Sequence, residues 1–240
     1  MKKQKSEEIV YGLNACLAVF AKRPSSIIRC YLDKNIKQRL GDNLKVLAKQ
    51  KSAYHLVEKD ELDKITNTTH HEGISLLVNK RPITRPVQAF SKLKGKVLVV
   101  ALCGVQNPHN IGAIARSAAH FGANGIILPE NFDPPASSYR VAEGGLENLI
   151  IANGTDEEIL ELKKLGFKLI APSPHTGTSL DKFNFPSKSI LILGAEGVGL
   201  DKKFEKKCDI LLNIPGSGTV ESLNVSAAAA VLLFVARKPN

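Results

Sequence analysis

Hydrophobic residues in the second half of the chain form short, continuous runs that alternate with segments of helical periodicity. Runs that are continuously apolar, rather than alternating, predict strands buried on both faces of a parallel sheet. The predicted strands are 96–105, 125–129, 167–174, 189–196 and 210–216. The predicted helices are 110–121, 155–166, 200–207 and a last helix from about residue 223. Strand and helix in alternation predict an α/β fold in which helices cover both faces of the sheet.

The first part of the chain has the pattern of a smaller α/β domain of about 80 residues, near the lower end of independent domain size. The strands expected there are 26–32, 54–58 and 73–79, and the expected helices are 7–24, 43–51 and 59–66. The stretch 79–96 has two prolines, no acidic residue and little periodicity, which is typical of a linker. We therefore predict a small domain over 1–80, a basic linker over 81–96 and a larger domain over 97–240.

The composition is that of a globular chain with a substantial core, since 43% of the 240 residues are hydrophobic. No apolar run approaches the ~20 residues that a membrane-spanning helix needs, and no apolar stretch of a secretion signal follows the basic N-terminus. The four cysteines lie far apart, without the spacing of a zinc site or a disulfide framework. These features predict a cytoplasmic protein with no membrane or metal partner, whose cysteines are small buried apolar residues.

Basic residues are concentrated in the first 96 positions. Residues 1–80 contain 15 Lys and Arg against 9 Asp and Glu, residues 81–96 contain 5 against none, and residues 97–240 contain 13 against 14. A basic surface can simply be solvated, but this uneven distribution favours a polyanion as the partner of the N-terminal part. Aromatic residues are only 5% of the chain, so we expect an RNA partner to be recognised through its shape and backbone more than through base stacking.

Three loops follow predicted strands and carry the candidate chemistry, because ligands of parallel sheets bind at the carboxyl ends of the strands. They are "GVQNPHN" (104–110), "GAEGVG" (194–199) and "IPGSGTVESLN" (214–224). The second loop lacks the GxGxxG spacing of a dinucleotide site, and a tight turn explains it equally well by itself. In the third loop, Ser222 or Asn224 could simply cap the last helix, as Asn110 could cap the helix 110–121, with Gly122 as its left-handed C-terminal residue.

Arg116 lies in the middle of a helix whose other members are nearly all small or apolar, with no acid three or four residues away. Gly112 is one turn earlier on the same helix face, and helical side chains lean toward the N-terminus. Arg116 can therefore extend across Gly112 toward the loop 104–110. Pairing with a buried carboxylate is the alternative, and Glu196 is a candidate partner.

Taken in order, "NPHNIGAIARSAAHFGA", "LILGAEGVGL" and "IPGSGTVESLNVSAAAAVLLF" resemble the three motifs of the SpoU family. This family comprises S-adenosylmethionine-dependent RNA 2′-O-ribose methyltransferases within the SPOUT superfamily. The resemblance covers residues 97–240, and residues 1–80, with "HEGI" near their end, resemble the small ribosomal-protein-like RNA-binding domain of the RlmB and YfiF-like branches. It implies an α/β trefoil-knot methyltransferase domain preceded by an RNA substrate-binding domain, and a homodimer whose active site lies at the subunit interface.

The resemblance also implies roles for individual residues. S-adenosyl-L-methionine would contact Gly194, Ile214 and Leu223, with Gly199 as a weaker candidate. Arg116 would be the catalytic residue at the target ribose, with Asn110, Glu196, Ser222 and Asn224 completing the pocket. Because a guanidinium stays protonated in most settings, an electrostatic role for Arg116 is favoured over that of a simple general base.

The sequence departs from the family pattern near the substrate side of the site. Gly216 stands where many relatives have methionine, and Glu143 and Gly145 stand where relatives often carry small or hydroxyl residues. Tyr139 and Arg140 are candidates for RNA contacts, although a solvated loop is the favoured interpretation of that stretch.

The favoured function is 2′-O-methylation of structured RNA, with 23S-type large-subunit ribosomal RNA as substrate and guanosine as target nucleoside. A transfer-RNA methyltransferase is the first alternative, although the additional N-terminal domain argues against it. A non-catalytic RNA-binding or ribosome-assembly factor of the same fold is the second, and a nucleotide-dependent oxidoreductase ranks last because the fingerprint is missing.

Overall fold

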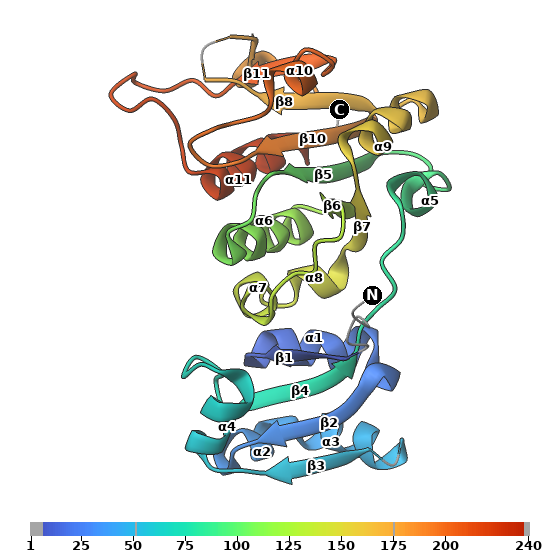
Figure 1. Ribbon diagram of the computed structural model, residues 1–240, viewed down its shortest axis with the longest axis vertical. Coiled ribbons are helices and arrows are strands. Elements are labelled where there is room, and N and C mark those ends of the chain that lie inside the picture. Colours follow the sequence, from blue (N-terminus) through green and yellow to red (C-terminus); the bar gives the residue numbers. More distant parts are fainter. Residues whose placement is uncertain (1–6, 51, 175, 238–240) are drawn as a thin grey trace. The chain divides into compact units, whose positions relative to one another are not determined.

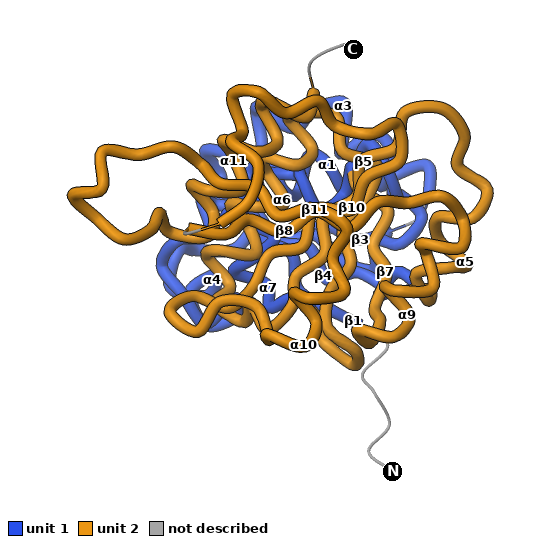
Figure 2. Tube along the Cα trace, turned by 90° about the horizontal axis from the view of Figure 1, so that it is seen from above, with its two compact units in different colours: residues 1–82, 134–148 blue, residues 83–133, 149–240 orange. Residues whose placement is uncertain are grey.

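The computed structural model describes residues 7–50, 52–174 and 176–237. The basic start of the chain, residues 1–6, lies outside the described residues. The chain forms two compact units, shown in different colours in Figure 2: unit 1 contains Met1–Pro82 and Pro134–Asn148, and unit 2 contains Ile83–Asp133 and Leu149–Asn240. The chain therefore passes between the units at three points of the sequence.

Unit 2 is built on a parallel sheet of seven strands in the order β7-β6-β5-β10-β8-β11-β9 (Figure 1). All pairings between these neighbours are parallel. The strands are β5 (Val97–Cys103), β6 (Gly125–Pro129), β7 (Ile150–Gly154), β8 (Lys168–Pro172), β9 (Thr178–Ser179), β10 (Lys188–Gly194) and β11 (Ile210–Asn213). Five of them coincide with the predicted apolar runs, and the predicted fold class is confirmed.

The helices of unit 2 are α5 (Pro86–Phe90), α6 (Pro108–His120), α9 (Asp156–Glu161), α10 (Lys202–Glu205) and α11 (Val225–Ala236). The predicted helix 155–166 is α9 followed by a 3-10 turn, Leu162–Leu165. α9 begins with a capping box, in which Thr155 and Glu158 each bond the other's backbone N–H. Gly122 has φ 78 after α6, as expected for a left-handed C-terminal residue.

The stretch 81–96 contains a helix that the sequence pattern did not predict. α5 begins at Pro86, because proline at the first helical position has the φ value that a helix requires and gives up only an N–H that would be unpaired. Phe90 at the end of α5 is fully buried. Its ring lies over Gly125, where an added Cβ would come within 2.6 Å of the Ile150 carbonyl and overlap the ring as well.

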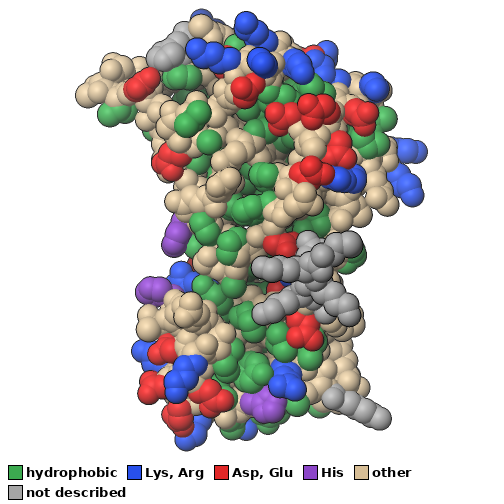
Figure 3. Space-filling view, viewed as in Figure 1, with side chains coloured by type: hydrophobic (Ala, Val, Ile, Leu, Met, Phe, Trp, Pro, Cys, Tyr) green, Lys and Arg blue, Asp and Glu red, His purple; other side chains and the backbone are tan. Residues whose placement is uncertain are grey.

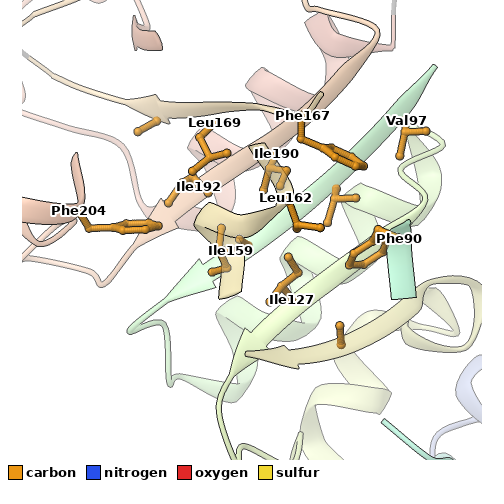
Figure 4. Close-up of a cluster of buried hydrophobic side chains, with 14 residues drawn as sticks. Phe90, Val97, Ile127, Ile159, Leu162, Phe167, Leu169, Ile190, Ile192 and Phe204 are labelled. Carbon is orange, nitrogen blue, oxygen red and sulfur yellow. The ribbon is translucent and has the colours of Figure 1, made fainter. Parts of the chain in front are cut away.

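Phe90 belongs to a cluster of buried side chains on one face of the seven-stranded sheet (Figure 4). The cluster draws on β5, β10, β8, β6 and β7 and on the helices over them, and its large members include Phe167, Ile190, Leu162 and Phe204. All four are at most 3% exposed. Burying such side chains contributes roughly 1.5–3 kcal/mol each, so the core supports the strands whose ends carry the three loops.

Unit 1 contains a four-stranded mixed sheet in the order β1-β4-β2-β3. Its strands are β1 (Glu7–Tyr11), β2 (Ile27–Leu32), β3 (Ala53–Leu56) and β4 (Ile74–Asn79). Its helices are α1 (Leu13–Lys22), α2 (Lys34–Lys37), α3 (Gly41–Lys49), α4 (Lys59–Thr66), α7 (Ala136–Ala142) and α8 (Gly145–Asn148). The predicted strands and the helices 43–51 and 59–66 are present, with residue 51 outside the described part.

The prediction of one helix over 7–24 is wrong at its start. Residues 7–11 form β1, which pairs with β4, and α1 begins only at Leu13. Gly12 separates the two with φ 93, a backbone conformation that a helix cannot contain. Hydrophobic residues around Gly12 fit either periodicity, so the pattern alone did not separate strand from helix.

Tyr139 and Arg140 lie on α7, in the stretch Pro134–Asn148 that belongs to unit 1, so the interpretation of these two residues as part of a solvated loop is wrong. Tyr139 is 4% exposed and donates from its hydroxyl to Glu8 Oε2 at 3.2 Å. Arg140 donates to the His70 carbonyl and pairs with Glu72. These contacts tie α7 to the four-stranded sheet rather than leaving its polar groups to solvent.

Arg23 joins α8 to α1 and β1. Its Nε and Nη2 donate to the two carboxylate oxygens of Glu147 at 3.0 and 2.9 Å, and its Nη2 also donates to Glu8 Oε1 at 3.1 Å. Burial raises the pKa of Glu8, although Arg23 acts in the opposite direction. A fork-shaped guanidinium between two buried carboxylates is a geometrically specific contact.

The cysteines are free thiols. Cys16 and Cys30 are buried, as predicted, and Cys103 and Cys208 are half-buried. Burial raises the pKa of Cys30 to about 12 and that of Cys208 to about 11, so these thiols stay protonated and poorly reactive at neutral pH. None of the helices in the described part of the chain combines the length and apolarity that a membrane crossing requires.

Candidate active site

The three candidate loops follow β5, β10 and β11 of unit 2. Because all neighbouring strands of this sheet are parallel, the carboxyl ends of these three strands lie at one edge of the sheet. β5 and β10 are direct neighbours, and β8 lies between β10 and β11. The topology therefore brings together segments that are up to about 110 residues apart in the sequence.

One hydrogen-bonded network connects all three loops. Asn110 Nδ2 donates to Glu196 Oε2 at 2.9 Å, and Asn224 Nδ2 donates to Glu196 Oε1 at 2.8 Å and to Asn110 Oδ1 at 3.3 Å. Each oxygen of the carboxylate thus accepts from one amide. Since α11 also packs against α6, the network fixes the starts of both helices beside the turn that carries Glu196.

Helix capping explains how Asn224 is held in place. It is the N-cap of α11, and its Oδ1 accepts from the Ser226 backbone N–H at 2.9 Å and from the Ser226 hydroxyl at 2.6 Å. With its carbonyl oxygen used for the cap, the amide nitrogen is turned toward Glu196. Capping and a place in the site are therefore compatible functions of Asn224.

The prediction that Asn110 caps its helix is wrong. The N-cap of α6 is Asn107, which accepts from the His109 backbone N–H, and Pro108 occupies the first helical position. Asn110 is inside the first turn and only 8% exposed. Its position inside the helix rules out the capping role, and its amide donates to Glu196 and accepts from Asn224 instead.

Arg116 lies on α6, six residues after Asn110, and its side chain is exposed. Gly112, one turn before it, is buried. The place of Arg116 in the site and its pairing with Glu196 stay predictions.

The loop 194–199 is a tight turn whose backbone requires glycine. Ala195 and Gly199 exchange two backbone hydrogen bonds, of 3.0 and 2.8 Å, and both Gly197 and Gly199 have positive φ, 78 and 75. A Cβ added to Gly194 would come within 2.5 Å of the Leu200 nitrogen. The turn is therefore closed against the end of β10, with Glu196 and the 88% exposed Val198 at its tip.

The third loop, 214–224, is exposed from Pro215 onward. Ile214 at its start is half-buried, and Ser222, Leu223 and Asn224 at its end are exposed. Leu223 is 48% exposed and Val220 is 71% exposed, which is unusual for aliphatic side chains and leaves apolar surface available to a ligand. The role of Ser222 stays a prediction.

These groups can perform a limited range of chemistry. The site offers exposed backbone at two glycine-bearing turns and one carboxylate held by two amides. Among the described residues, no group of three or more His, Cys, Asp and Glu side chains is placed to hold a metal ion. The arrangement suits binding of a ligand by main-chain atoms and charge, followed by a reaction in which positioning is the main contribution.

Sequence reasoning did not identify two residues that support this site. Ser226 supports Asn224 through both its backbone and its hydroxyl group. Asn107 replaces Asn110 as the cap, and "NP" directly before a helix was the available signal, because proline is favoured at the first helical position.

Comparison with protein families gives two matches along the chain. The SpoU rRNA Methylase family matches residues 97–234. A second family, described as RNA 2′-O ribose methyltransferase substrate binding, matches residues 9–84. Of curated proteins, an uncharacterized tRNA/rRNA methyltransferase, YfiF, of Escherichia coli O157:H7 is 35% identical over 237 residues, which cover 97% of this chain and 69% of that protein. The 23S rRNA (guanosine-2′-O-)-methyltransferase RlmB of Nitrosomonas europaea is 31% identical over 233 residues, which cover 95% of this chain and 90% of that protein.

Solved structures with the same fold include two that contain a bound cofactor. The SpoU methyltransferase AviRb from Streptomyces viridochromogenes, in complex with the cofactor AdoMet, has a TM-score of 0.80 at 21% identity and covers 97% of this chain and 90% of its own. An AdoMet-bound rRNA methyltransferase from Sinorhizobium meliloti has a TM-score of 0.79 at 21% identity, and the match covers 97% of this chain and 87% of that structure's chain. At this level of identity, the likeness shows the fold.

Proposed function

Because the chain belongs to the SpoU rRNA Methylase family, we propose that it transfers a methyl group from S-adenosyl-L-methionine to a ribose 2′-hydroxyl of structured RNA. The proposed substrate is 23S-type large-subunit ribosomal RNA with guanosine as the target nucleoside, because the relative named as such an enzyme is similar over 95% of the chain. The observation that supports the proposal most is the network of Asn110, Glu196 and Asn224, which joins three loops in one place.

The loops fit an adenosine-containing ligand. The tight turn at Gly194 and Gly199 leaves backbone groups exposed at its tip, and Ile214 and Leu223 offer apolar surface for a flat ring. These four residues would hold the cofactor, which supplies an electrophilic sulfonium methyl group when bound. The nearby Glu196 carboxylate contributes a negative charge that favours a cationic ligand.

The residues of this chain must then position the ribose and assist the loss of one proton. Arg116 would grip the phosphate of the target nucleotide and stabilise negative charge on the 2′-oxygen as the proton leaves. Asn110, Glu196 and Asn224 would keep the wall of the pocket rigid, and Ser222 would complete it.

The domain organisation gives each part of the chain a role in this proposal. The domain 1–80 would dock the RNA, as its basic charge and the substrate-binding match over residues 9–84 suggest. Residues 81–96 would connect it to the methyltransferase domain 97–240, in which a trefoil knot would surround the cofactor.

We further propose that the protein acts as a homodimer with the active site at the subunit interface. α11 presents Ala227, Val231 and Phe234 to solvent, and these residues follow one stripe of the helix. Val231 is 38% and Phe234 is 44% exposed. A second copy packed on this stripe would bury it close to the loop 214–224 that precedes α11.

The substrate is tested by incubating the protein with methyl-labelled S-adenosylmethionine and total RNA from a strain that lacks the gene. The proposal predicts label in large-subunit ribosomal RNA at one nucleotide. Label confined to transfer RNA would move the substrate to that class. No label in any RNA, with or without ribosomal particles, would overturn the proposed activity in favour of a binding or assembly factor.

A further inference from the structure

One face of the four-stranded sheet in unit 1 exposes side chains along β2 and β3. The register of the strands places Tyr31 beside His55, and Arg29 beside Ala53, on the same face. Arg29 is also paired with Leu77 of β4, which in turn is paired with Ile9 of β1. Arg29 and His55 are exposed, and Tyr31, Leu77 and Ile9 are half-buried.

The opposite face of the same sheet is the core of unit 1. Alternate residues of the strands, Val10, Cys30, Leu32, Leu76 and Val78, are fully buried. A sheet with one buried face normally carries polar residues on the other. On the other face, Ser75 and Tyr11 are buried in the row of Tyr31. The part of this face that stays open carries aliphatic side chains, a tyrosine, a histidine and an arginine, which is a composition typical of a binding surface.

Tyr31 and His55 form a stacked pair of rings. Their centroids are 5.4 Å apart, and their planes are inclined by 24°. Tyr31 is half-buried and holds the imidazole in place, while His55 is exposed and presents its outer side to solvent. Arg29 lies two residues before Tyr31 on the same strand face, next to this stack. Figure 3 shows hydrophobic, basic and His side chains side by side on the viewed surface of the molecule.

We propose that Arg29, Tyr31 and His55, the stacking face, bind single-stranded nucleotides of the RNA substrate. A base would continue the stack of Tyr31 and His55, and the Arg29 guanidinium would contact the phosphate next to it. This proposal rests on the proposed function for its choice of RNA, and it adds the surface and the contacts by which the RNA is held.

The charge around the stacking face favours a polyanion, rather than a protein segment, as the ligand of this surface. The first 80 residues contain 15 basic residues against 9 acidic ones. Glu7 is the acidic residue of β1 on the same face, and it lies at the end of that face paired with Asn79. A negatively charged backbone can therefore approach along β2 and β3 without meeting a carboxylate on these two strands.

All four tyrosines of the chain lie in unit 1. Tyr11 and Tyr139 are buried. Tyr31 is half-buried on β2, and Tyr54 is exposed on β3, where it is paired with Cys30 and therefore lies on the opposite face of the sheet. The low aromatic content predicted that base stacking contributes little. The fold changes this expectation at one point, because it stacks the ring of Tyr31 on the imidazole of the exposed His55.

The test measures binding of a short, fluorescein-labelled single-stranded RNA by anisotropy. We expect His55→Ala to weaken binding about ten-fold, the typical loss of one stacking ring, and His55→Phe to restore it. Arg29→Ala should weaken binding and reduce the slope of log K against log salt by about 0.7, the value for one phosphate contact on a single strand. His70→Ala and Arg39→Ala are the matched controls, since both residues are exposed in the same unit outside its sheet. His70→Ala should leave binding unchanged, and Arg39→Ala should weaken it less than Arg29→Ala.

Two further measurements separate this proposal from the proposed function. Circular dichroism and S-adenosylmethionine affinity should be unchanged in all variants, and with active protein the loss should be in KM for RNA rather than in kcat. If wild-type protein transfers no methyl group, the anisotropy result still decides the stacking face. Unchanged RNA binding by His55→Ala and Arg29→Ala, or equal losses in the control variants, overturns it.

Discussion

Asn224 combines two functions in one side chain. Its carbonyl oxygen caps α11, and its amide nitrogen donates to Glu196 and Asn110. The alternatives that the sequence left open, a helix cap or a site residue, are therefore both realised. The amide of Asn110, by contrast, is used in the network alone, and Asn107 provides the cap of α6.

Arg116 is the residue on which catalysis is expected to depend. Arg116→Ala removes the charge that would stabilise the 2′-oxygen, so we expect methyl transfer to fall at least about 10²-fold, with the affinity for S-adenosylmethionine unchanged by calorimetry. Arg116→Lys keeps the charge but loses the two-pronged geometry, and it should retain a small part of the activity. Normal transfer by Arg116→Ala would show that the role is wrong.

Gly194 is expected to be required by the turn behind Glu196. A Cβ there would come within 2.5 Å of the Leu200 nitrogen, so Gly194→Ala should lower the free energy of unfolding by about 1–3 kcal/mol and weaken cofactor binding. Gly216→Ala is the matched control, because nothing lies within 4 Å of its added Cβ. Urea unfolding and calorimetry of both variants measure the difference, and equal behaviour of the two would contradict a tight turn.

At the scale of elements, strands buried on both faces could be predicted from sequence, and segments with mixed patterns could not. β5, β6, β8, β10 and β11 are continuous apolar runs, and such runs have few alternatives in a chain of this composition. β1 was predicted as helix because its apolar residues continue into α1, and only Gly12 marks the boundary. α7 and α8 depend on partners far away in sequence, such as Glu8 and Arg23, which no local pattern contains.

Asp209 positions β11 beside β8 and gives the fold a pH dependence. Its carboxylate accepts from the Leu169 backbone N–H at 2.9 Å and pairs with Lys163 and Lys168. Burial raises the pKa of this carboxyl, but these partners outweigh burial, and its pKa is lowered from the ordinary value of 3.8.

A carboxyl whose pKa is lower in the folded state than in the unfolded state stabilises the fold at pH values above its unfolded-state pKa. This stabilisation is lost as pH falls through its folded-state pKa. Asp209→Asn should therefore lower the free energy of unfolding at neutral pH, and the difference from wild type should shrink as pH falls below 3.8 and disappear below the lowered folded-state pKa. Urea titrations at several pH values measure it. A difference that persists at acid pH would show that the carboxylate charge is not the cause.

At the scale of the whole molecule, the chain passes between its two units three times, because residues 134–148 leave the sheet of unit 2 between β6 and β7 and fold with unit 1. The sequence pattern placed these residues in the larger domain, since their position between two strands is the only local information. The convergence of three distant loops was predicted through the family resemblance, whereas spacing alone left each of them as an ordinary turn or cap.

The exposed stripe on α11 predicts self-association. Val231→Glu places a charge in the proposed interface, and it should convert a dimer to a monomer in light scattering and abolish methyl transfer while circular dichroism stays unchanged. Lys164→Glu adds the same carboxylate at another exposed position and should stay dimeric. A monomeric wild-type protein with full activity would contradict the dimer.

The most direct test of the central claim is the chemical position of the transferred methyl group. RNA labelled by the wild-type protein is digested to nucleosides and compared with RNA treated with Arg116→Ala. The account predicts label in a 2′-O-methylated ribose, which makes the adjacent phosphodiester resistant to alkali, and no label with the variant. Label on a base, or equal labelling by the variant, would contradict it.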